Sequence, residues 1–167
     1  LASVGACGHV IGLIINFFVG LSTGVGVVLA PSIGKSTNEE SKKIISTAFI
    51  SSVIIGIVAF LIAIPCGKPL LYLTKCPEEC FEGALTYTMI CYTGIPVITV
   101  YNFCATAIRV TGDSRRPTLY MIIAGALNLI LNVILCFTLK NKVAAVAIAT
   151  VVSQTLGAFL VVRHLVH

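Results

Sequence analysis

Residues 117–162 read PTLYMIIAGALNLILNVILCFTLKNKVAAVAIATVVSQTLGAFLVV, and this stretch decides the fold. It contains two charge-free runs, Pro117–Leu139 and Val143–Val162, separated only by the link Lys140-Asn141-Lys142. About 20 apolar residues in a helix, at ~1.5 Å per residue, cross the ~30 Å hydrocarbon core of a bilayer. The stretch therefore predicts two membrane-spanning helices that form a tight antiparallel hairpin.

The same pattern covers most of the 167-residue chain. Three further stretches lack Asp, Glu, Lys and Arg: Leu1–Gly34, Ile44–Ile64 and Gly83–Ile108. Hydrophobic residues make up 57% of the chain and charged residues only 10%, whereas a soluble domain carries about 25% charged residues. The sequence predicts an all-α integral membrane protein with about five transmembrane helices. It excludes a soluble domain, a disordered chain and a disulfide-rich secreted scaffold.

The basic residues fall into two groups, because successive loops lie on alternating sides of the membrane. The larger group is Lys35, Lys42, Lys43, Arg109, Arg115, Arg116 and Arg163, and the smaller group is Lys68, Lys75, Lys140 and Lys142. By the positive-inside rule, the larger group is expected in the cytoplasm. These residues form no continuous basic face, so nucleic acid is not expected as a partner.

Prolines predict two irregularities in the spans. The second charge-free stretch is expected to end as a helix at Pro65. Pro96 lies inside the third stretch, where a proline lacks the N–H group and forces a kink in the helix. Pro96 is therefore a candidate helix hinge, with a static bend as the alternative.

Polar side chains within the hairpin form the main candidate site. Asn128 and Asn132 are four residues apart, as are Thr150 and Gln154, so each pair shares one face of its helix. Counted from the span ends, Asn132 and Thr150 lie roughly 10 Å deep, and the other two lie roughly 16 Å deep. One interpretation is a cluster of neutral oxygens that lines an ion or substrate cavity. Hydrogen bonding between the helices is the alternative, and the sequence favours neither.

A second spacing of four on the last span joins Ala145, Ala149, Ser153 and Gly157. Small residues on one face of a membrane helix allow another helix to approach closely. This ladder of small residues therefore predicts tight packing against a neighbouring helix.

The loop between the third and fourth spans has features of helix ends. Gly112 is expected to end one helix in a left-handed conformation, and Asp113 or Ser114 is expected to cap the next. An ion pair between Asp113 and an arginine is one way to latch a gate here. The candidate cytoplasmic anchor consists of Arg109, Asp113, Arg115 and Arg116.

Chemistry inside the membrane is not expected. The charge-free stretches contain no acid–base pair for hydrolysis, so an enzyme is the least favoured class. Cys76 and Cys80 form a C-P-E-E-C pair, which suggests a disulfide or a metal pair. Two ligands without a second pair are a weak metal signal, and loop cysteines without chemistry are favoured. No metal site and no organic cofactor are expected.

The loop and the two asparagines resemble a known family. The segment Ala107-Ile108-Arg109…Gly112-Asp113…Pro117 resembles the R-G-x-G-D-x-x-x-P signature of the MATE family, the multidrug and toxic compound extrusion exporters. The segment 128–132 resembles the N-x-x-x-D motif of the family's fifth helix, and 146–154 resembles its sixth helix. The segments 20–24 and 33–34 resemble the second helix and the loop that follows it.

The resemblance implies a fold of twelve helices in two lobes, in which residues 1–167 are a partial N-terminal lobe with the second to sixth helices. It implies a secondary active antiporter of the plasma membrane that exports cationic or amphipathic compounds in exchange for Na⁺ or H⁺. The expected partners are the remaining helices of the full-length transporter, the lipid bilayer, and small organic cations or amphipathic drugs. Two lobes that rock around a central cavity would perform the transport.

Carried over by motif, the family's ion site corresponds to Asn128, Asn132 and Thr150. The family's acidic residue is Asn132 here, and an amide neither takes up nor releases a proton. A Na⁺ site built from neutral oxygens remains, with less charge and weaker affinity. The sequence also departs from the family at Pro31, Val110 and Ala145.

Two alternatives to an exporter stay open. The first is a flippase of the same superfold for a lipid-linked substrate, which would need cationic residues in its cavity. The second is a membrane protein that transports nothing and only packs with partners. Hydration of the polar cluster would separate the second alternative from a transporter.

Overall fold

A computed structural model describes residues 12, 16–17, 20, 38–73 and 78–166 of the chain. Residues 38–73 and 78–166 form the helices α2 (Asn38–Leu73), α3 (Glu78–Thr93), α4 (Ile95–Val110), α5 (Arg115–Thr138) and α6 (Lys142–Val166). These two ranges contain no strand. The all-α prediction is confirmed for them.

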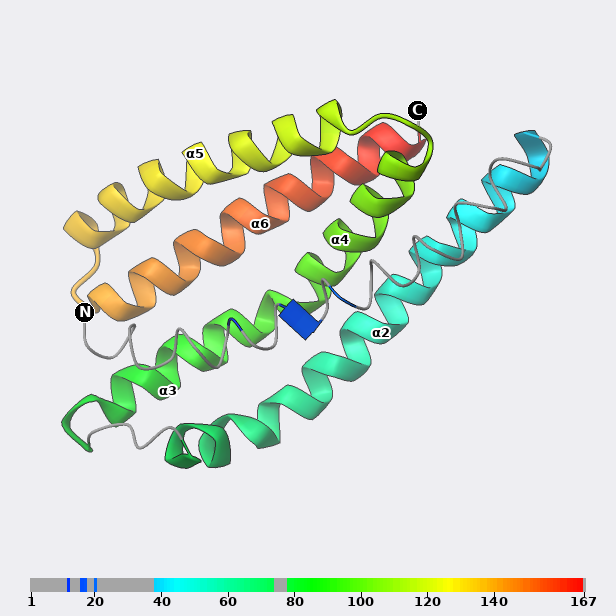
Figure 1. Ribbon diagram of the computed structural model, residues 1–167. Coiled ribbons are helices and arrows are strands. Elements are labelled where there is room, and N and C mark those ends of the chain that lie inside the picture. The colour runs from blue at the N-terminus through cyan, green and yellow to red at the C-terminus, as the bar shows by residue number, and fades with distance from the viewer. Residues whose placement is uncertain (1–11, 13–15, 18–19, 21–37, 74–77, 167) are drawn as a thin grey trace.

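The helices lie side by side in one row (Figure 1). α5 and α6 run antiparallel and pack along their whole length, and α6 also packs against α3 and α4. α2 packs on the other side of α4 and α3. α6 is therefore an inner helix with neighbours on both sides, whereas α2 and α5 form the edges of the row.

Three of these helices are long and apolar enough to cross a bilayer: Ile45–Pro69, Arg115–Thr138 and Lys142–Leu165. The pair Phe81–Thr93 and Ile95–Val110 makes a fourth crossing if it is one broken span. These four segments match four of the five predicted spans. The remaining one, Leu1–Gly34, lies almost wholly outside the described residues.

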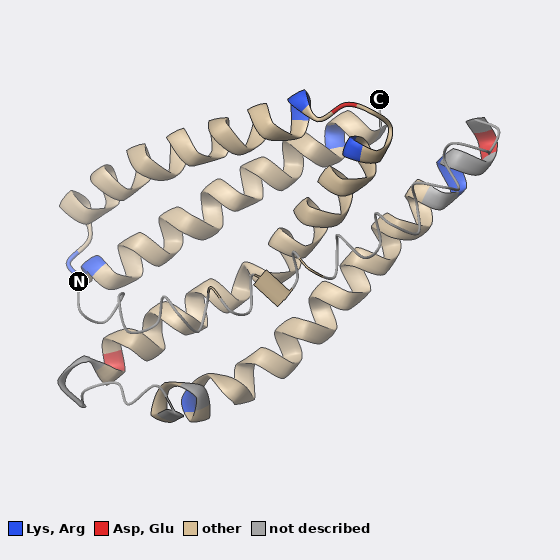
Figure 2. Ribbon diagram, viewed as in Figure 1, with Lys and Arg blue, Asp and Glu red and all other residues tan. Residues whose placement is uncertain are grey.

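Charged residues occur only toward the ends of the described helices (Figure 2). The start of α2, the end of α4, the start of α5 and the end of α6 lie toward one end of the row, and they carry the described members of the larger basic group. The end of α2 and the α5–α6 link lie toward the opposite end. The structure thus separates the described members of the two basic groups as the alternation of loops predicts, while Lys35 and Lys75 lie outside the described residues.

The predicted end of the second span at Pro65 is wrong. α2 continues through Pro65 and Pro69 to Leu73. Its last turns pack on α3, where Leu71 is buried against Ala84. Packing on a neighbouring helix offsets the loss of the backbone hydrogen bonds that the prolines remove. Membrane helices tolerate proline in this way.

The third span is broken at Gly94, where the axes of α3 and α4 differ by 44°. Pro96 lies in the first turn of α4, a position where a proline needs no helical hydrogen bond. A Cβ on Gly56 of α2 would lie 2.8 Å from Pro96 Cα, so only a glycine allows α2 to come this close. On the other side, a Cβ on Gly94 would lie 3.1 Å from Gln154 Oε1. The bend is therefore held between α2 and α6, and its use as a hinge stays a prediction.

The small-residue ladder of α6 is buried, as predicted. Ala145, Ala149 and Gly157 have no more than marginal exposure, and Ser153 is 3% exposed. A Cβ on Gly157 would lie 3.2 Å from Ala124 Cβ of α5, which is tighter than ordinary contact. The ladder brings α5 and α6 together and fixes which residues of the two helices meet.

Candidate functional site

A chain of polar contacts connects α5 to α6. Asn132 Nδ2 donates a hydrogen bond to Asn128 Oδ1 at 3.0 Å, within α5. Asn128 Nδ2 in turn donates to Ser153 Oγ at 3.2 Å and, more weakly, to Thr150 Oγ1 at 3.5 Å. We call these four residues, Asn128, Asn132, Thr150 and Ser153, the polar network.

The hydroxyl groups of the polar network donate to the backbone of α6. Thr150 Oγ1 donates to the carbonyl of Val146 at 2.9 Å, and Ser153 Oγ donates to the carbonyl of Thr150 at 2.9 Å. One oxygen is left over, because Asn132 Oδ1 is buried and accepts no hydrogen bond from any residue that the structure describes. A buried carbonyl oxygen without a donor costs free energy unless a ligand, a cation or water satisfies it.

The chemistry of the network suits a hard cation. Carboxamide and hydroxyl oxygens are ligands that such ions accept, and the oxygens of Asn128, Thr150 and Ser153 each keep a lone pair beyond the one they share. None of these groups titrates near neutral pH. Asn132 Oδ1 is the free oxygen around which such a site would form.

Gln154, the fourth predicted residue, lies apart from the network. Its carboxamide has no hydrogen bond to another described residue, and its Oε1 lies beside Gly94 at the helix bend. Successive helix residues differ in direction by about 100°. Ser153 therefore faces Asn128 on α5, while Gln154 faces α3 and α4. Gln154 is therefore not hydrogen-bonded to the polar network, and its role in an ion or substrate cavity stays a prediction.

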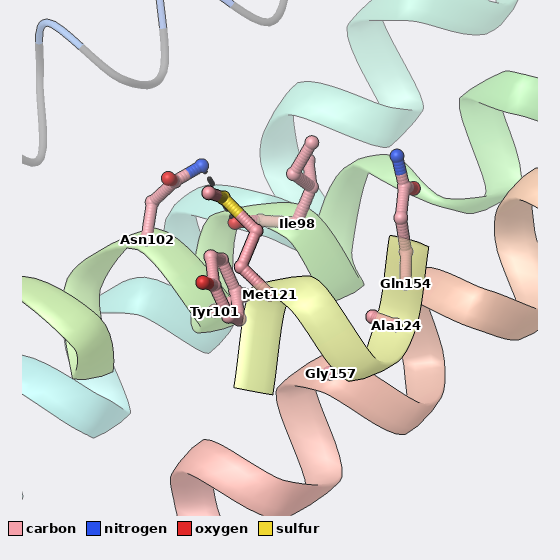
Figure 3. A pocket seen from close by; sticks show the side chains of 7 residues that line it. All are labelled: Ile98, Tyr101, Asn102, Met121, Ala124, Gln154 and Gly157. Atoms are coloured by element: carbon pink, nitrogen blue, oxygen red, sulfur yellow. Dashed lines mark hydrogen bonds between the residues drawn. The ribbon is translucent and has the colours of Figure 1, made fainter. Parts of the chain in front are cut away.

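Gln154 instead lines a cavity of about 280 Å³ between α4, α5 and α6 (Figure 3). The residues that line it are Ile98, Tyr101, Asn102, Met121, Ala124, Gln154 and Gly157. The walls are almost wholly apolar, and Asn102 and Gln154 lie on either side of Ile98 and Met121 in Figure 3.

Tyr101 fixes one wall of the cavity to the start of α5. Its hydroxyl donates to the carbonyl of Pro117 at 3.1 Å. Asn102 Nδ2 donates to the carbonyl of Ile98 at 2.9 Å, one turn back in α4. Both side chains are thus held in place without any contact to a ligand.

The loop between α4 and α5 forms the predicted helix ends. Gly112 has a φ of 95°, in the left-handed region that favours glycine. Asp113 Oδ1 accepts hydrogen bonds from the backbone N–H groups of Arg115 and Arg116, at 3.1 and 3.2 Å. Asp113 therefore caps α5, and its negative charge lies at the favourable end of the helix dipole.

The predicted ion pair of Asp113 forms with Arg116, three residues further along the chain. This pair cannot latch one helix to another, because both residues belong to the start of α5. Arg116 Nη1 instead reaches across to the His164 ring of α6, 3.1 Å from Nε2. Arg109 and Arg115 are exposed near the same end of the row.

Sequence reasoning missed Ser153, Tyr101, Asn102 and Met121 as site residues. The small-residue ladder contains Ser153 and so held the signal for its contact with α5. The described residues contain no group of three His, Cys, Asp or Glu side chains that could bind a metal ion. Cys76 lies outside the described residues, and so does the side chain of Cys80.

Comparison with known proteins identifies the family. A family model described as MatE matches residues 1–134. The chain belongs to the MatE family. The probable multidrug resistance protein YoeA of Bacillus subtilis (strain 168) is 27% identical over 153 residues, which cover 89% of this chain and 33% of YoeA. The probable multidrug resistance protein YpnP of the same organism is 28% identical over 159 residues, which cover 90% of this chain and 35% of YpnP.

Another curated relative carries a different name. The FAD transporter of Shewanella oneidensis is 27% identical over 163 residues, which cover 91% of this chain and 36% of that protein. The chain thus spans about a third of the length of the curated relatives it matches.

Two solved structures of a multidrug resistance MATE family transporter share the fold. The inward-facing conformation matches with a TM-score of 0.89 and 27% identity, over 98% of this chain and 37% of that one. The outward-facing conformation matches with a TM-score of 0.87 and 27% identity, over 96% and 36%. The fold of the MatE chain is therefore that of a multi-pass membrane transporter segment.

Proposed function

We propose that the chain is part of a secondary active antiporter that exports amphipathic compounds, organic cations among them, in exchange for an inorganic cation. Residues 1–167 are the second to sixth helices of its first lobe, and the remaining helices of the full-length transporter complete the transport path. The antiporter lies in the plasma membrane, with the α4–α5 loop in the cytoplasm.

The cavity between α4, α5 and α6 is the observation that carries this proposal. Ligand sites in helical membrane proteins are mostly apolar cavities with a few polar groups, and this one has Asn102 and Gln154 in an apolar wall. The cavity therefore favours a transporter over a packing protein.

The polar network supports Na⁺ as the coupling ion at this site. Its side chains are all neutral, and Asn132 Oδ1 is a buried acceptor without a donor among the described residues. H⁺ coupling at this site would need a group that titrates. The transporter thus needs no organic cofactor here, only the coupling ion.

A lipid flippase receives less support. Recognition of a charged lipid headgroup needs basic residues in the cavity, and the residues that line it in the described part of the chain are uncharged.

The likeness to an inward-facing and to an outward-facing MATE family transporter structure supports the rocking of a rigid lobe. The TM-scores are 0.89 for the inward-facing and 0.87 for the outward-facing structure. A segment that keeps its fold in both states moves as one body. The four described spans would then carry the cavity and the network together.

The proposal is tested with the full-length transporter in inside-out vesicles. A Na⁺ gradient is imposed at constant pH, a pH gradient is imposed without Na⁺, and uptake of ethidium is followed by fluorescence. We expect uptake to follow the Na⁺ gradient. The variant Asn132→Ala is expected to lower Na⁺-driven uptake roughly tenfold, because it removes the carboxamide oxygen that would coordinate the cation.

The matched control is Val133→Ala, at the next residue of α5, where the side chain is exposed. It is expected to keep uptake within about twofold of the wild type, as a surface change away from the site. Unchanged Na⁺-driven uptake in Asn132→Ala defeats the assignment of the ion site. Absence of gradient-driven uptake of every amphipathic compound tried defeats the antiporter proposal.

A further inference from the structure

A buried cluster holds the end of α4, the start of α5 and the end of α6 together. Ile108 of α4 and Val161 of α6 are 3% and 0% exposed, and Tyr120 of α5 packs against the cluster that they form. Tyr101 of α4 also donates its hydroxyl to the carbonyl of Pro117, at the start of α5. The charged residues that adjoin this cluster in the sequence are therefore held at one level, toward one end of the row (Figure 2).

Basic side chains outnumber acidic ones at these three helix ends. The end of α4, the loop that follows it, the start of α5 and the last turn of α6 contain one acid, Asp113, and four arginines: Arg109, Arg115, Arg116 and Arg163. Asp113 Oδ1 already accepts two backbone N–H groups of α5, and its Oδ2 lies 3.3 Å from Arg116 Nε. One carboxylate offsets at most one of the four charges. The helix ends thus carry a surplus of positive charge.

Arg116 is held in place and still faces solvent. Its Nε pairs with Asp113, and its Nη1 lies 3.1 Å from His164 Nε2 on α6. A guanidinium has five N–H donors, so donors remain for a further acceptor, and the side chain is 59% exposed. The planar fork of a guanidinium matches two oxygens of one phosphate group. Arg116 is therefore positioned to bind a phosphate where α5 meets α6.

Below the arginines, α5 presents exposed apolar side chains. Leu119, Ile122 and Ile123 are 53%, 60% and 41% exposed. Leu119 follows Arg115 by four residues and Arg116 by three, a spacing that places side chains on one helix face. Ile122 and Ile123 each follow one of these arginines by two turns. Because α5 is long and apolar enough to cross a bilayer, this face lies along the hydrocarbon while the arginines lie at the depth of the headgroups.

We propose that the start of α5 and the end of α6 bind the phosphate of an anionic phospholipid. Arg115 and Arg116 contact the phosphate, His164 holds Arg116 in position, and the acyl chains lie along Leu119 and Ile123. A zwitterionic lipid carries the same phosphate with a positive group that the arginines repel, so the net charge of the headgroup decides the preference. The assignment concerns lipid binding and does not rest on the proposed antiport.

Lipid binding to the full-length transporter in detergent tests the assignment. Three ligands are compared by titration and native mass spectrometry: dioleoyl phosphatidylglycerol, dioleoyl phosphatidylcholine with the same acyl chains, and glycerol 3-phosphate, which has the phosphate without the chains. On the unaltered protein we expect the tightest site to bind phosphatidylglycerol roughly tenfold more tightly than phosphatidylcholine. Glycerol 3-phosphate is expected not to bind measurably at the same concentrations.

Variants then locate the tightest site. Arg115→Gln/Arg116→Gln is expected to weaken its affinity for phosphatidylglycerol roughly thirtyfold, at the usual contribution of two basic residues near an anionic surface. Both side chains are exposed, so the variant is expected to fold. The matched control Lys140→Gln/Lys142→Gln removes the same charge from the opposite end of the same two helices (Figure 2). It is expected to leave this affinity unchanged.

Several outcomes overturn the assignment. Equal affinities for the two lipids on the unaltered protein do so, and so does unchanged phosphatidylglycerol binding in the arginine variant. An equal loss in the lysine control would mean that only the total charge matters. Binding of glycerol 3-phosphate as tight as that of phosphatidylglycerol would show a site for a soluble phosphate in place of a lipid. The comparisons between ligands use the unaltered protein, so a variant that fails to fold does not affect them.

Discussion

The polar network and the cavity lie next to each other on α6, and they use similar side chains in opposite ways. In the network, each N–H or O–H donor that the structure assigns is bound to a neighbouring side chain or to a backbone carbonyl. In the cavity, Gln154 has no such bond to a described residue. The difference teaches that an amide within the membrane belongs to the fold when it is paired. When it stays unpaired beside an apolar wall, it is available to a ligand.

The largest effect is expected when Asn128, the residue at the centre of the polar network, is replaced. Asn128→Leu removes the contacts of Asn128 with Asn132, Ser153 and Thr150 and leaves their partners buried. We expect the full-length transporter to lose about 2 kcal/mol of stability, at roughly 0.6 kcal/mol for each hydrogen bond between membrane helices. Thermal unfolding in detergent measures the loss. The control Leu129→Ala, at an exposed neighbour, shows what truncation alone costs, and equal losses in the two variants would mean that the network has no structural role.

Disturbing the close packing of α5 on α6 is expected to cause the next largest loss of stability. In Gly157→Ala, the new methyl group lies 3.2 Å from Ala124 Cβ, so the two helices must separate slightly. We expect a loss of about 1 kcal/mol, at the low end for overpacking. The double variant Ala124→Gly/Gly157→Ala should recover most of the stability. Failure of this rescue would show that the helices do not meet at these two residues.

The exposed contacts of Arg116 extend the comparison to a polar cluster outside the helix interfaces. Arg116 is paired with Asp113 and contacts His164, but its side chain is 59% exposed. Arg116→Gln is therefore expected to cost less than about 1 kcal/mol, as exposed ion pairs do. The loss should shrink when the unfolding is repeated in high salt, because salt screens exposed charges. A loss as large as that of Asn128→Leu would contradict the ranking.

The smallest effect on stability is expected in the cavity itself. Gln154→Leu breaks no hydrogen bond with a described residue, so stability should change by no more than about 0.5 kcal/mol. Thermal unfolding beside the wild type is sufficient to measure this. A loss that matches Asn128→Leu would show that Gln154 belongs to the fold and would remove the contrast between the two regions.

The spans were predictable from sequence because a bilayer leaves the backbone little choice. A charge-free run such as Pro117–Leu139 must satisfy its backbone hydrogen bonds within a helix. The effect of the prolines was harder to predict. Pro65 and Pro69 lie inside α2, whereas the third span breaks at Gly94, two residues before Pro96. Which outcome a proline has depends on the neighbouring helix, and no local pattern contains that information.

The depth of the candidate-site residues along their helices was predictable from the sequence, but the direction of their side chains was not. Counting from the span ends placed Gln154 at the depth of Asn128, and the residue that Asn128 contacts is Ser153, one position earlier. Depth follows from a rise of ~1.5 Å per residue, while direction depends on the rotation of the helix about its axis. That rotation is set by packing of small residues such as Gly157. The cavity residues of α4 could not be predicted, because they meet α5 and α6 only through the bend.

The direction of the hydrogen bonds in the network has an electrical consequence. The bonds run from Asn132 through Asn128 to two hydroxyls, and these end on backbone carbonyls of α6. A relay of protons needs groups that accept one hydrogen and pass on another, and neither amides nor peptide carbonyls do this at neutral pH. The chain of hydrogen bonds therefore does not conduct protons. In the proposed antiporter, such a lobe would carry an ion without also leaking acid along the same path.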